Sequence, residues 1–299
     1  MPKTILITGG SGFIGRHLQE KLAEKGYVIR TLTTQRINSN VDDQFYWNPE
    51  TGEINRKAFE SVDYIIHLAG ASIGTNRWTN QRKQLILDSR VKSTELLFYK
   101  IRQYNIPLKA FITASATGYY GSVTSTEIFD ESSQVAHDFL GNVCREWEMA
   151  ADLFSEAKIR TVKIRTGVVL SNNAPALKKM LMPIKLGIGS PLGNGKQYMP
   201  WIHIDDLCNI YLRAIEDECF SGAYNAVAPQ HITNREMMKK LAKAYHKPFW
   251  FPPVPAFLLR ILLGEMAVII LKGSRVEPKR LIEAGFQFQH TDIVKVEDF

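Results

Sequence analysis

Short apolar runs alternate with longer stretches that carry apolar residues at helical spacing along the first 170 residues. The runs are typical of strands buried on both faces of a sheet, and they lie at 5–7, 27–32, 64–68, 110–114 and 161–170. Helical patterns follow several of them, at 14–22, 77–102 and 139–157. Strands that alternate with helices predict an α/β fold built on a doubly wound parallel sheet.

The first apolar run ends in a glycine turn over residues 8–15, where Gly9, Gly12 and Gly15 stand three apart. In a dinucleotide site these glycines allow a tight turn, a close approach to a pyrophosphate and close helix–strand packing. The N-terminus of the following helix offers N–H groups and a partial positive charge to phosphates. Strand, turn and helix together predict cofactor contacts from Gly9, Ser11, Gly12, Phe13, Ile14 and Gly15.

The end of the second predicted strand bears on the choice between NAD and NADP. A carboxylate there would hold the ribose 2′-hydroxyl of NAD, but this sequence has Thr33, Thr34 and Arg36. Two hydroxyls and a cation can accept a 2′-phosphate, and Arg16 adds a second cation nearby. The pattern therefore favours NADP, with NAD less expected. The open alternative is that Arg36 is only an exposed loop residue.

The other predicted strands also end in residues suited to a ligand. Leu68, Ala69 and Gly70 are expected to contact the cofactor, because the small residues Ala69, Gly70 and Ala71 let the chain pass close to it. Val168, which follows the glycine of the fifth run, is expected to contact it as well. His67 lies inside an apolar run and is expected to be a core histidine. Since ligands bind at the carboxyl ends of strands in such sheets, these segments are expected to meet in one crevice.

The pattern of alternating strands and helices weakens from residue 171, after which glycines and prolines cluster. We expect a dinucleotide-binding domain over 1–170, completed by about 203–228, and a substrate lobe with a C-terminal domain over 171–202 and 229–299. A loop is expected over 40–57, and a helix after residue 203 with Asp205 or Asp206 as its cap.

The most apolar stretch, 256–271, contains Arg260 and Glu265. Because a bilayer span needs about 20 apolar residues, we expect a buried or docked helix, with a membrane or partner-binding role as the alternative. Of the 299 residues 45% are apolar, so a sizeable core is available.

The net charge is +7 and the pI about 9.2, yet no basic run or nucleic-acid motif is present. An anionic cofactor accounts for part of this charge, and the expected partner is a small molecule rather than nucleic acid or a membrane. Three cysteines without a CxxC spacing indicate reduced thiols, and the N-terminus has no signal-peptide pattern, so a cytoplasmic location is expected. The spacing of the seven histidines shows no metal-ligand cluster, and no pattern indicates an oligomeric state.

The segments 8–15, 67–70 and 119–121 resemble the extended short-chain dehydrogenase/reductase superfamily. More narrowly, the chain resembles its atypical epimerase-family subgroup, whose C-terminal domain of unknown function is similar to residues 250–299. The supporting motifs are Arg77-Trp78, Ser89-Arg90, Trp147-Glu148, 165–170, 200–207, 225–229 and Gly285-Phe286. The resemblance implies a Rossmann-type NADP-binding domain with a small substrate lobe.

Typical members use a Ser or Thr, a Tyr, and a Lys four residues after the Tyr. On one helix face the ammonium reaches both the phenol and the cofactor ribose, and it assists a phenol whose ordinary pKa is near 10. Here the register from Trp147-Glu148 places Leu140 at the Tyr position and Cys144 at the Lys position. Hydride transfer with the usual acid/base pair is therefore not expected.

Two hypotheses remain. In the first, an NADP-dependent oxidoreductase or epimerase-like enzyme acts on an unknown small molecule. Ser115 or Thr117 would then position a substrate oxygen, and Tyr119 or Tyr120 would supply a phenol; substrate would be bound by Arg77, Arg165 and His203. In the second, the protein is a non-catalytic NADP-binding sensor or scaffold, and these side chains serve packing.

Overall fold

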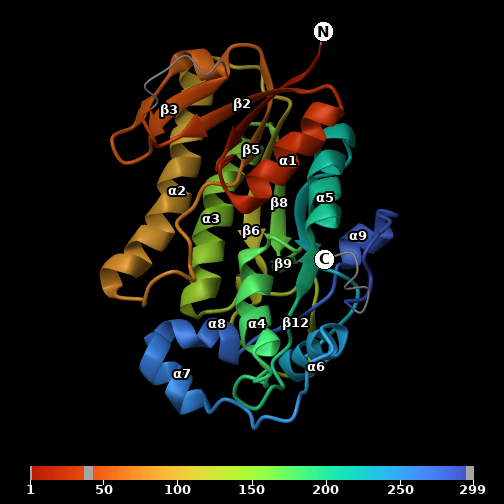
Figure 1. Ribbon diagram of the computed structural model, residues 1–299. Helices are drawn as coiled ribbons and strands as arrows, with labels where there is room; N and C mark the ends of the chain where they lie inside the picture. Colours follow the sequence, from red (N-terminus) through yellow and green to blue (C-terminus); the bar gives the residue numbers. More distant parts are fainter. Residues whose placement is uncertain (1, 37–42, 294–299) are drawn as a thin grey trace.

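In a computed structural model of the protein, residues 2–36 and 43–293 are described. Their central element is an 8-stranded sheet in the order β11-β8-β6-β5-β1-β2-β3-β4 (Figure 1). The strands are β1 (Thr4–Thr8), β2 (Val28–Thr33), β3 (Gln44–Asn48), β4 (Glu53–Ile54), β5 (Val62–His67), β6 (Ala110–Ala116), β8 (Arg160–Thr166) and β11 (Gly222–Ala226). Every pairing is parallel except that of β3 with β4.

Helices cover both faces of this sheet (Figure 1). Alternate residues of β1 face opposite ways: Ile5 and Ile7 pack in one cluster with residues of α1 (Phe13–Glu24) and α5 (Ile204–Glu216). Leu6 packs in the other cluster with residues of α2 (Asn80–Gln103) and α3 (Phe139–Glu156). The prediction of a doubly wound Rossmann-type sheet is confirmed.

The region after β8 contains more regular structure than expected. Gly167 lies between β8 and β9 (Val168–Leu170). It passes close to the Pro200 backbone, since a Cβ there would lie 2.5 Å from the Pro200 carbonyl oxygen. β9 pairs with β10 (Trp201–His203) rather than with the large sheet. The segment 171–202, expected to belong to the substrate lobe, also contains α4 (Pro175–Lys185). This helix packs near α6 (Asn234–Ala244) around a separate apolar cluster. The single strand predicted over 161–170 is therefore wrong.

Two local predictions are corrected by burial and capping. The polar segment 40–57, which the structure describes from residue 43, is not a simple loop. β3 and β4 form an antiparallel pair in it, and Trp47 of β3 is buried in the core. A short 3-10 helix, η1 (Arg56–Phe59), follows. At α5 the N-cap is His203, whose side chain accepts the Asp205 N–H, so neither Asp205 nor Asp206 is the cap.

The apolar stretch 256–271 is broken rather than one helix. α7 (Ala256–Leu263) ends at Gly264, which has a φ of 62° and begins η3 (Gly264–Ala267), followed by α8 (Val268–Leu271). No residue of α7 is buried, and Ile261 and Leu262 are about two-thirds exposed. Met266, Val268 and Ile269 instead pack on the cluster around Trp78. Of the two forms expected for this stretch, α7 is not buried, whereas η3 and α8 dock on the fold.

The C-terminal segment is tied back to the large sheet. β12 (Arg275–Val276) pairs with β7 (Ile128–Phe129), and α9 (Lys279–Glu283) follows beside β11 (Figure 1). The carboxylate of Asp206 accepts the N–H groups of Gln289 and His290 at 2.8 and 2.9 Å. Among the described residues, no helix has the length and apolar character needed to cross a membrane.

Candidate functional site

The glycine turn between β1 and α1 is tightly packed yet open on its outer side. Gly9 has a φ of +69°, and a Cβ there would lie 2.8 Å from the carbonyl carbon of Leu68. A Cβ at Gly15 would strike the backbone of Gly9 and would lie 2.8 Å from the Gly10 Cα. Ser11 and Gly12 remain exposed, and Gly12 caps α1 without a side-chain bond. The first N–H groups of α1 are thus available to an anion.

A hydroxyl fixes the ends of β1 and β5 beside this turn. Thr8 Oγ1 lies 2.7 Å from His67 Nδ1 and accepts the N–H groups of Leu68 and Ala69. Ser93 Oγ lies 3.0 Å from the other His67 nitrogen. Burial, with a smaller effect of the Arg90 cation, lowers the pKa of His67 from 6.5 to about 3. The prediction of a core histidine is confirmed, and its role is to hold Leu68 and Ala69 at the crevice.

The residues expected to select NADP lie at the carboxyl end of β2. Thr34 and Arg36 are exposed, and Thr33 Oγ1 accepts the Gln35 N–H at 3.2 Å. The Arg36 guanidinium lies 5.7 Å from the centre of the Tyr46 ring. Because Thr8 is the register partner of Leu32, this segment adjoins the glycine turn. Its exposed hydroxyl and cation suit a phosphate.

Arg16 and Phe13 connect the turn to its surroundings. Arg16 Nη1 donates to the Ser11 carbonyl at 2.7 Å, which holds a second cation against the turn. Phe13 and Val168 pack against the same apolar cluster, which contains Trp201. The expected cofactor residues Phe13 and Val168 are therefore brought together by packing.

A buried polar network lies where β6, β8 and α3 meet. Ser115 and Arg165 are register partners on β6 and β8. Ser115 Oγ donates to Glu148 Oε1 at 2.7 Å, and Arg165 donates to both Glu148 oxygens at 2.8 Å. Arg165 Nη1 also donates to the Tyr120 hydroxyl at 2.9 Å, and that hydroxyl donates to Asn225 Oδ1 at 2.7 Å. All five side chains are buried.

Burial and hydrogen bonding change the pKa values of two members of this network. Burial alone would lower the pKa of Arg165, but the bonds to Glu148 and its charge outweigh it and raise the pKa. Burial raises the pKa of the Tyr120 phenol, although Arg165 opposes this. Ser115, Tyr120 and Arg165 were expected to act on a substrate. In the structure their polar atoms bond one another, Glu148 and Asn225.

Thr117 and Tyr119 occupy a more open position on η2 (Thr117–Tyr120). Both are half-buried, and the Tyr119 ring stacks on the Arg165 guanidinium, whose carbon lies 3.4 Å from the ring centre. Of the four residues proposed to contact substrate oxygens or move protons, these two are the ones that are not buried.

The α3 face turned toward η2 is apolar. α3 contains neither Tyr nor Lys. A Cβ at Gly118 would lie 3.3 Å from the Leu140 Cβ and 3.6 Å from the Cys144 sulfur. Cys144 Sγ lies 3.6 Å from the Ala116 carbonyl oxygen, and burial raises the pKa of this thiol to about 12. Leu140 and Cys144 therefore contribute neutral side chains beside η2, and the nearest charge on α3 is that of Glu148, which pairs with Arg165.

Arg90 on α2 lies beside the end of β5. Sequence patterns include it only in a motif of the family resemblance and predict no role for it. A Cβ at Gly70 would lie 3.1 Å from the Arg90 guanidinium carbon. Arg90 Nη1 donates to the carbonyls of Ala71 and Ile86 at 3.1 and 2.8 Å. The guanidinium also lies 5.0 Å from the Trp147 ring centre, and burial lowers its pKa from 12.5 to about 10.

Arg77, an expected substrate ligand, has a different role. Its side chain donates to the backbone carbonyls of Ile261 and Leu262, the latter at 3.0 Å. Lys83 of α2 forms an ion pair with Glu265 nearby. Arg77 thus fastens the end of α7 to the fold, because both of these acceptors belong to that helix.

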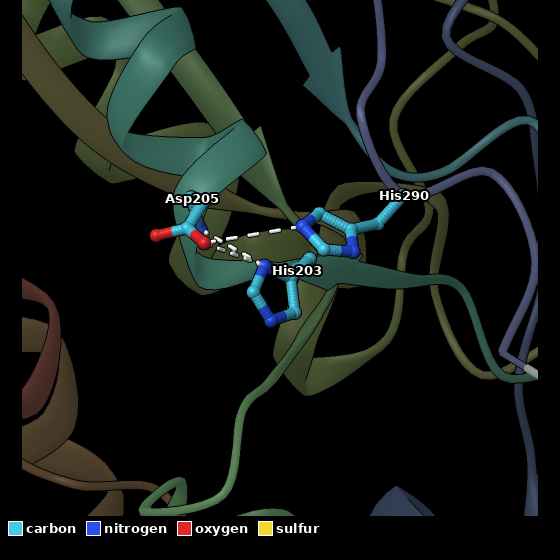
Figure 2. A group of neighbouring side chains, drawn as sticks. All are labelled: His203, Asp205 and His290. Carbon is cyan, nitrogen blue, oxygen red and sulfur yellow. Dashed lines mark hydrogen bonds and ion pairs between the residues drawn. The ribbon is translucent and has the colours of Figure 1, made fainter. Parts of the chain in front are cut away.

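His203, the third expected substrate ligand, is buried in a cluster that spacing could not reveal (Figure 2). Its Nδ1 accepts the Asp205 N–H at 3.3 Å and lies 3.4 Å from Asp205 Oδ2. His290 Nε2 lies 3.9 Å from the same oxygen, and the two imidazole centres are 3.7 Å apart. Three possible metal-ligand atoms thus lie within 4.8 Å of one another. The two rings are inclined to each other by 34°, so they also pack against one another at the end of β10.

Comparison with known proteins places these features in a wider group. A family model described as "NAD dependent epimerase/dehydratase family" matches residues 5–226, and one described as "Domain of unknown function (DUF1731)" matches residues 254–295. An epimerase family protein of Mycobacterium leprae is 35% identical over 290 residues, which cover 97% of this chain and 92% of that protein.

Two further relatives extend the comparison. The chloroplastic SDR39U1 homolog of Arabidopsis thaliana, also named an epimerase family protein, is 36% identical over 297 residues, covering 96% of this chain and 83% of that protein. The crystal structure of human epimerase family protein SDR39U1 (isoform 2) with NADPH matches with a TM-score of 0.87 at 30% identity. That match covers 99% of this chain and 100% of the human one.

Proposed function

Because this chain belongs to the NAD dependent epimerase/dehydratase family, we propose that it binds NADP in the crevice at the glycine turn and acts on a small molecule as an oxidoreductase or epimerase-like enzyme. The observation that carries the proposal is the geometry of the turn. Glycine is needed where Gly9 and Gly15 meet neighbouring backbone, and the uncapped N-terminus of α1 faces outward. This is the arrangement that a pyrophosphate requires.

The preference for NADP over NAD rests on the end of β2. Thr33, Thr34 and Arg36 offer hydroxyls and a cation where a carboxylate would repel a 2′-phosphate. Arg16, held against the turn by its bond to Ser11, adds positive charge. The solved human relative carries NADPH by its own description, which agrees with this proposal.

When bound, NADP supplies the hydride donor or acceptor, and the chain's residues bind and orient the reactants. Leu68, Ala69 and Gly70 would let the chain pass close to the cofactor, with Thr8 fixing the first two. Thr117 would position a substrate oxygen, and Tyr119, stacked on Arg165, would hold or move a proton at its phenol oxygen. Ser115 and Tyr120 would support this region from the buried network.

A second candidate function, a non-catalytic NADP-binding sensor or scaffold, has one specific observation in its favour. The α3 face toward η2 presents Leu140 and Cys144 in place of an acid/base pair. We assign either function to the cytoplasm on the basis of the three free thiols, with a small molecule rather than nucleic acid or a membrane as partner.

Titration of the purified protein with NADPH and NADH, followed by cofactor fluorescence, tests the proposal. Tighter binding of NADPH is the expected result, and binding of neither cofactor would refute both functions. A panel of carbonyl compounds, alcohols and sugar nucleotides then separates the two candidates. Reproducible cofactor turnover with one compound supports the enzyme, whereas tight binding with no turnover across the panel supports the sensor.

A further inference from the structure

We propose that Arg90 is the cation that binds the nicotinamide-ribose half of the cofactor, from α2 rather than from α3. The inference rests on the proposed function and deepens it, because it assigns a residue to the half of the site for which α3 supplies no cation. Three observations support it: the strand beside which Arg90 lies, the contacts of its guanidinium, and its charge.

The order of strands gives the cofactor a direction. The glycine turn follows β1, with β2 on one side of it and β5, then β6, on the other. If the 2′-phosphate lies at Thr33–Arg36 beyond β2, the opposite half of the dinucleotide must run toward β5 and β6. Arg90 lies on that side, against Gly70 just after β5 and against Trp147 of α3.

The contacts of Arg90 place its guanidinium at the edge of the crevice. Gly70 is exposed, and its missing side chain leaves room for the guanidinium directly beside the backbone. Trp147 supports the guanidinium from α3, and the carbonyls of Ala71 and Ile86 fix Nη1. In the described part of the chain, both hydrogen bonds of Arg90 come from Nη1. A guanidinium has five N–H donors, so the N–H groups of Nε and Nη2 can still donate hydrogen bonds to a ligand.

The charge of Arg90 is not balanced as that of Arg165 is. Arg165 forms a bidentate ion pair with Glu148. Among residues 2–36 and 43–293, by contrast, no carboxylate forms an ion pair with Arg90. Arg90 is half-buried, and a partly desolvated cation without a counterion is stabilised by a ligand that supplies acceptors. The cofactor's hydroxyl and phosphate oxygens are acceptors of that kind.

The neighbouring α3 face agrees with this assignment. Cys144 is one turn before Trp147, whose ring centre lies 5.0 Å from the Arg90 guanidinium. A lysine at residue 144 would place a second cation beside the Arg90 guanidinium. The neutral thiol avoids that repulsion, so one cation on α2 takes the position that α3 leaves uncharged.

The test compares two ligands that share the adenosine half. NADPH carries the nicotinamide ribose, whereas 2′,5′-ADP carries only the adenosine with its two phosphates. Arg90→Gln should weaken NADPH binding about 10-fold or more, the usual effect of losing hydrogen bonds from a charged donor, and should change 2′,5′-ADP binding less than about twofold. Arg90→Lys, which keeps the charge with fewer donors, should show a smaller loss for NADPH alone. Arg102→Gln, an exposed position near the end of the same helix, is the control and should change neither.

Unchanged NADPH binding by Arg90→Gln would overturn the assignment, and so would equal losses for both ligands. Failure of the wild-type protein to bind either ligand would instead refute the proposed function. If Arg90→Gln does not fold, as judged by its melting curve without ligand, Arg90→Lys decides: a loss confined to NADPH supports the assignment, and no such loss overturns it.

Discussion

The guanidinium of Arg165 makes two 2.8 Å hydrogen bonds to the carboxylate of Glu148, and both side chains are almost wholly buried, at 4% and 6% exposed. The pair joins β8 to α3 directly beneath η2. Ser115 and Tyr120 complete it, since each shares a hydrogen bond with one of the two partners. The position of Tyr119 therefore depends on this ion pair, because its ring rests on the same guanidinium.

Glu148→Gln should lower the free energy of unfolding by about 3–5 kcal/mol, because it leaves the Arg165 charge buried without a full counterion. Urea denaturation followed by circular dichroism measures this loss. Asp152→Asn is the matched control, since Asp152 pairs with Lys163 across the same two elements but is 42% exposed. That variant should lose only about 0–1 kcal/mol. Equal effects of the two substitutions would contradict the reading of the Arg165–Glu148 pair.

Gly15→Ala should abolish detectable NADPH binding and lower stability by about 1–3 kcal/mol, because the added Cβ would strike the Gly9 and Gly10 backbone. Fluorescence titration and thermal melting report the two effects. Gly74→Ala is the control: its Cβ would meet no atom within 4 Å, so stability should change by less than about 0.5 kcal/mol. Normal NADPH affinity in Gly15→Ala would remove the glycine turn from the cofactor site.

Arg36→Gln should weaken NADPH binding about tenfold and leave NADH binding within about twofold, because only NADPH carries the 2′-phosphate. The same fluorescence titration measures both constants. Raising the salt concentration should narrow the difference between wild type and variant, since Arg36 is exposed and its charge is screened. Parallel losses for the two cofactors would show that Arg36 does not select between them.

Tyr119→Phe and Tyr120→Phe should separate chemistry from stability. Tyr120→Phe removes bonds to Asn225 and Arg165 and should cost about 1–3 kcal/mol of stability. Tyr119→Phe should melt like the wild type and, with a substrate found in the panel, reduce kcat by about 10²-fold or more. Wild-type turnover in Tyr119→Phe would exclude its phenol from the reaction.

The stability of the protein should fall between pH 6.5 and about pH 3 partly because of His67, whose pKa burial depresses from 6.5 to about 3. In this window the unfolded chain binds a proton at His67 that the folded chain excludes, so unfolding is favoured as the pH falls. One such proton corresponds to a slope of about 1.4 kcal/mol per pH unit. His67→Gln should lower stability at pH 7 and flatten the slope by about one proton in urea denaturation. An unchanged slope would contradict the depressed pKa.

The sequence predicted the features that depend on neighbouring residues. Ile5, Leu6 and Ile7 followed by spaced glycines specify a strand, a turn and a helix within one short segment, and the structure has all three. The capping box of α6 is equally local, since Thr233 and Glu236 are three residues apart and each side chain bonds the other's backbone. Such local patterns carry their own geometry.

Features that depend on distant residues could not be predicted. Nothing in the spacing of His203 indicates that the His290 ring packs against it, because the contact depends on the path of the C-terminal segment. The side chains of Ser115 and Tyr120 resembled site residues by their position after a strand. Their burial follows from Arg165 and Glu148, which reach them from other elements. The break at Gly264 was hidden by the apolar residues on either side of it.

The bonds between the C-terminal segment and the sheet have a consequence for synthesis on the ribosome. Asp206 receives its N–H partners from residues 83 and 84 positions later, and Glu131 accepts the N–H of Arg280, 149 positions later. The emerging chain can form its early strands but not these contacts, so Asp206 and Glu131 lack these partners until residues 280–290 have been synthesised. The strands of the Rossmann sheet therefore emerge before the contacts that fasten the C-terminal segment, and chaperones have a long interval in which to act.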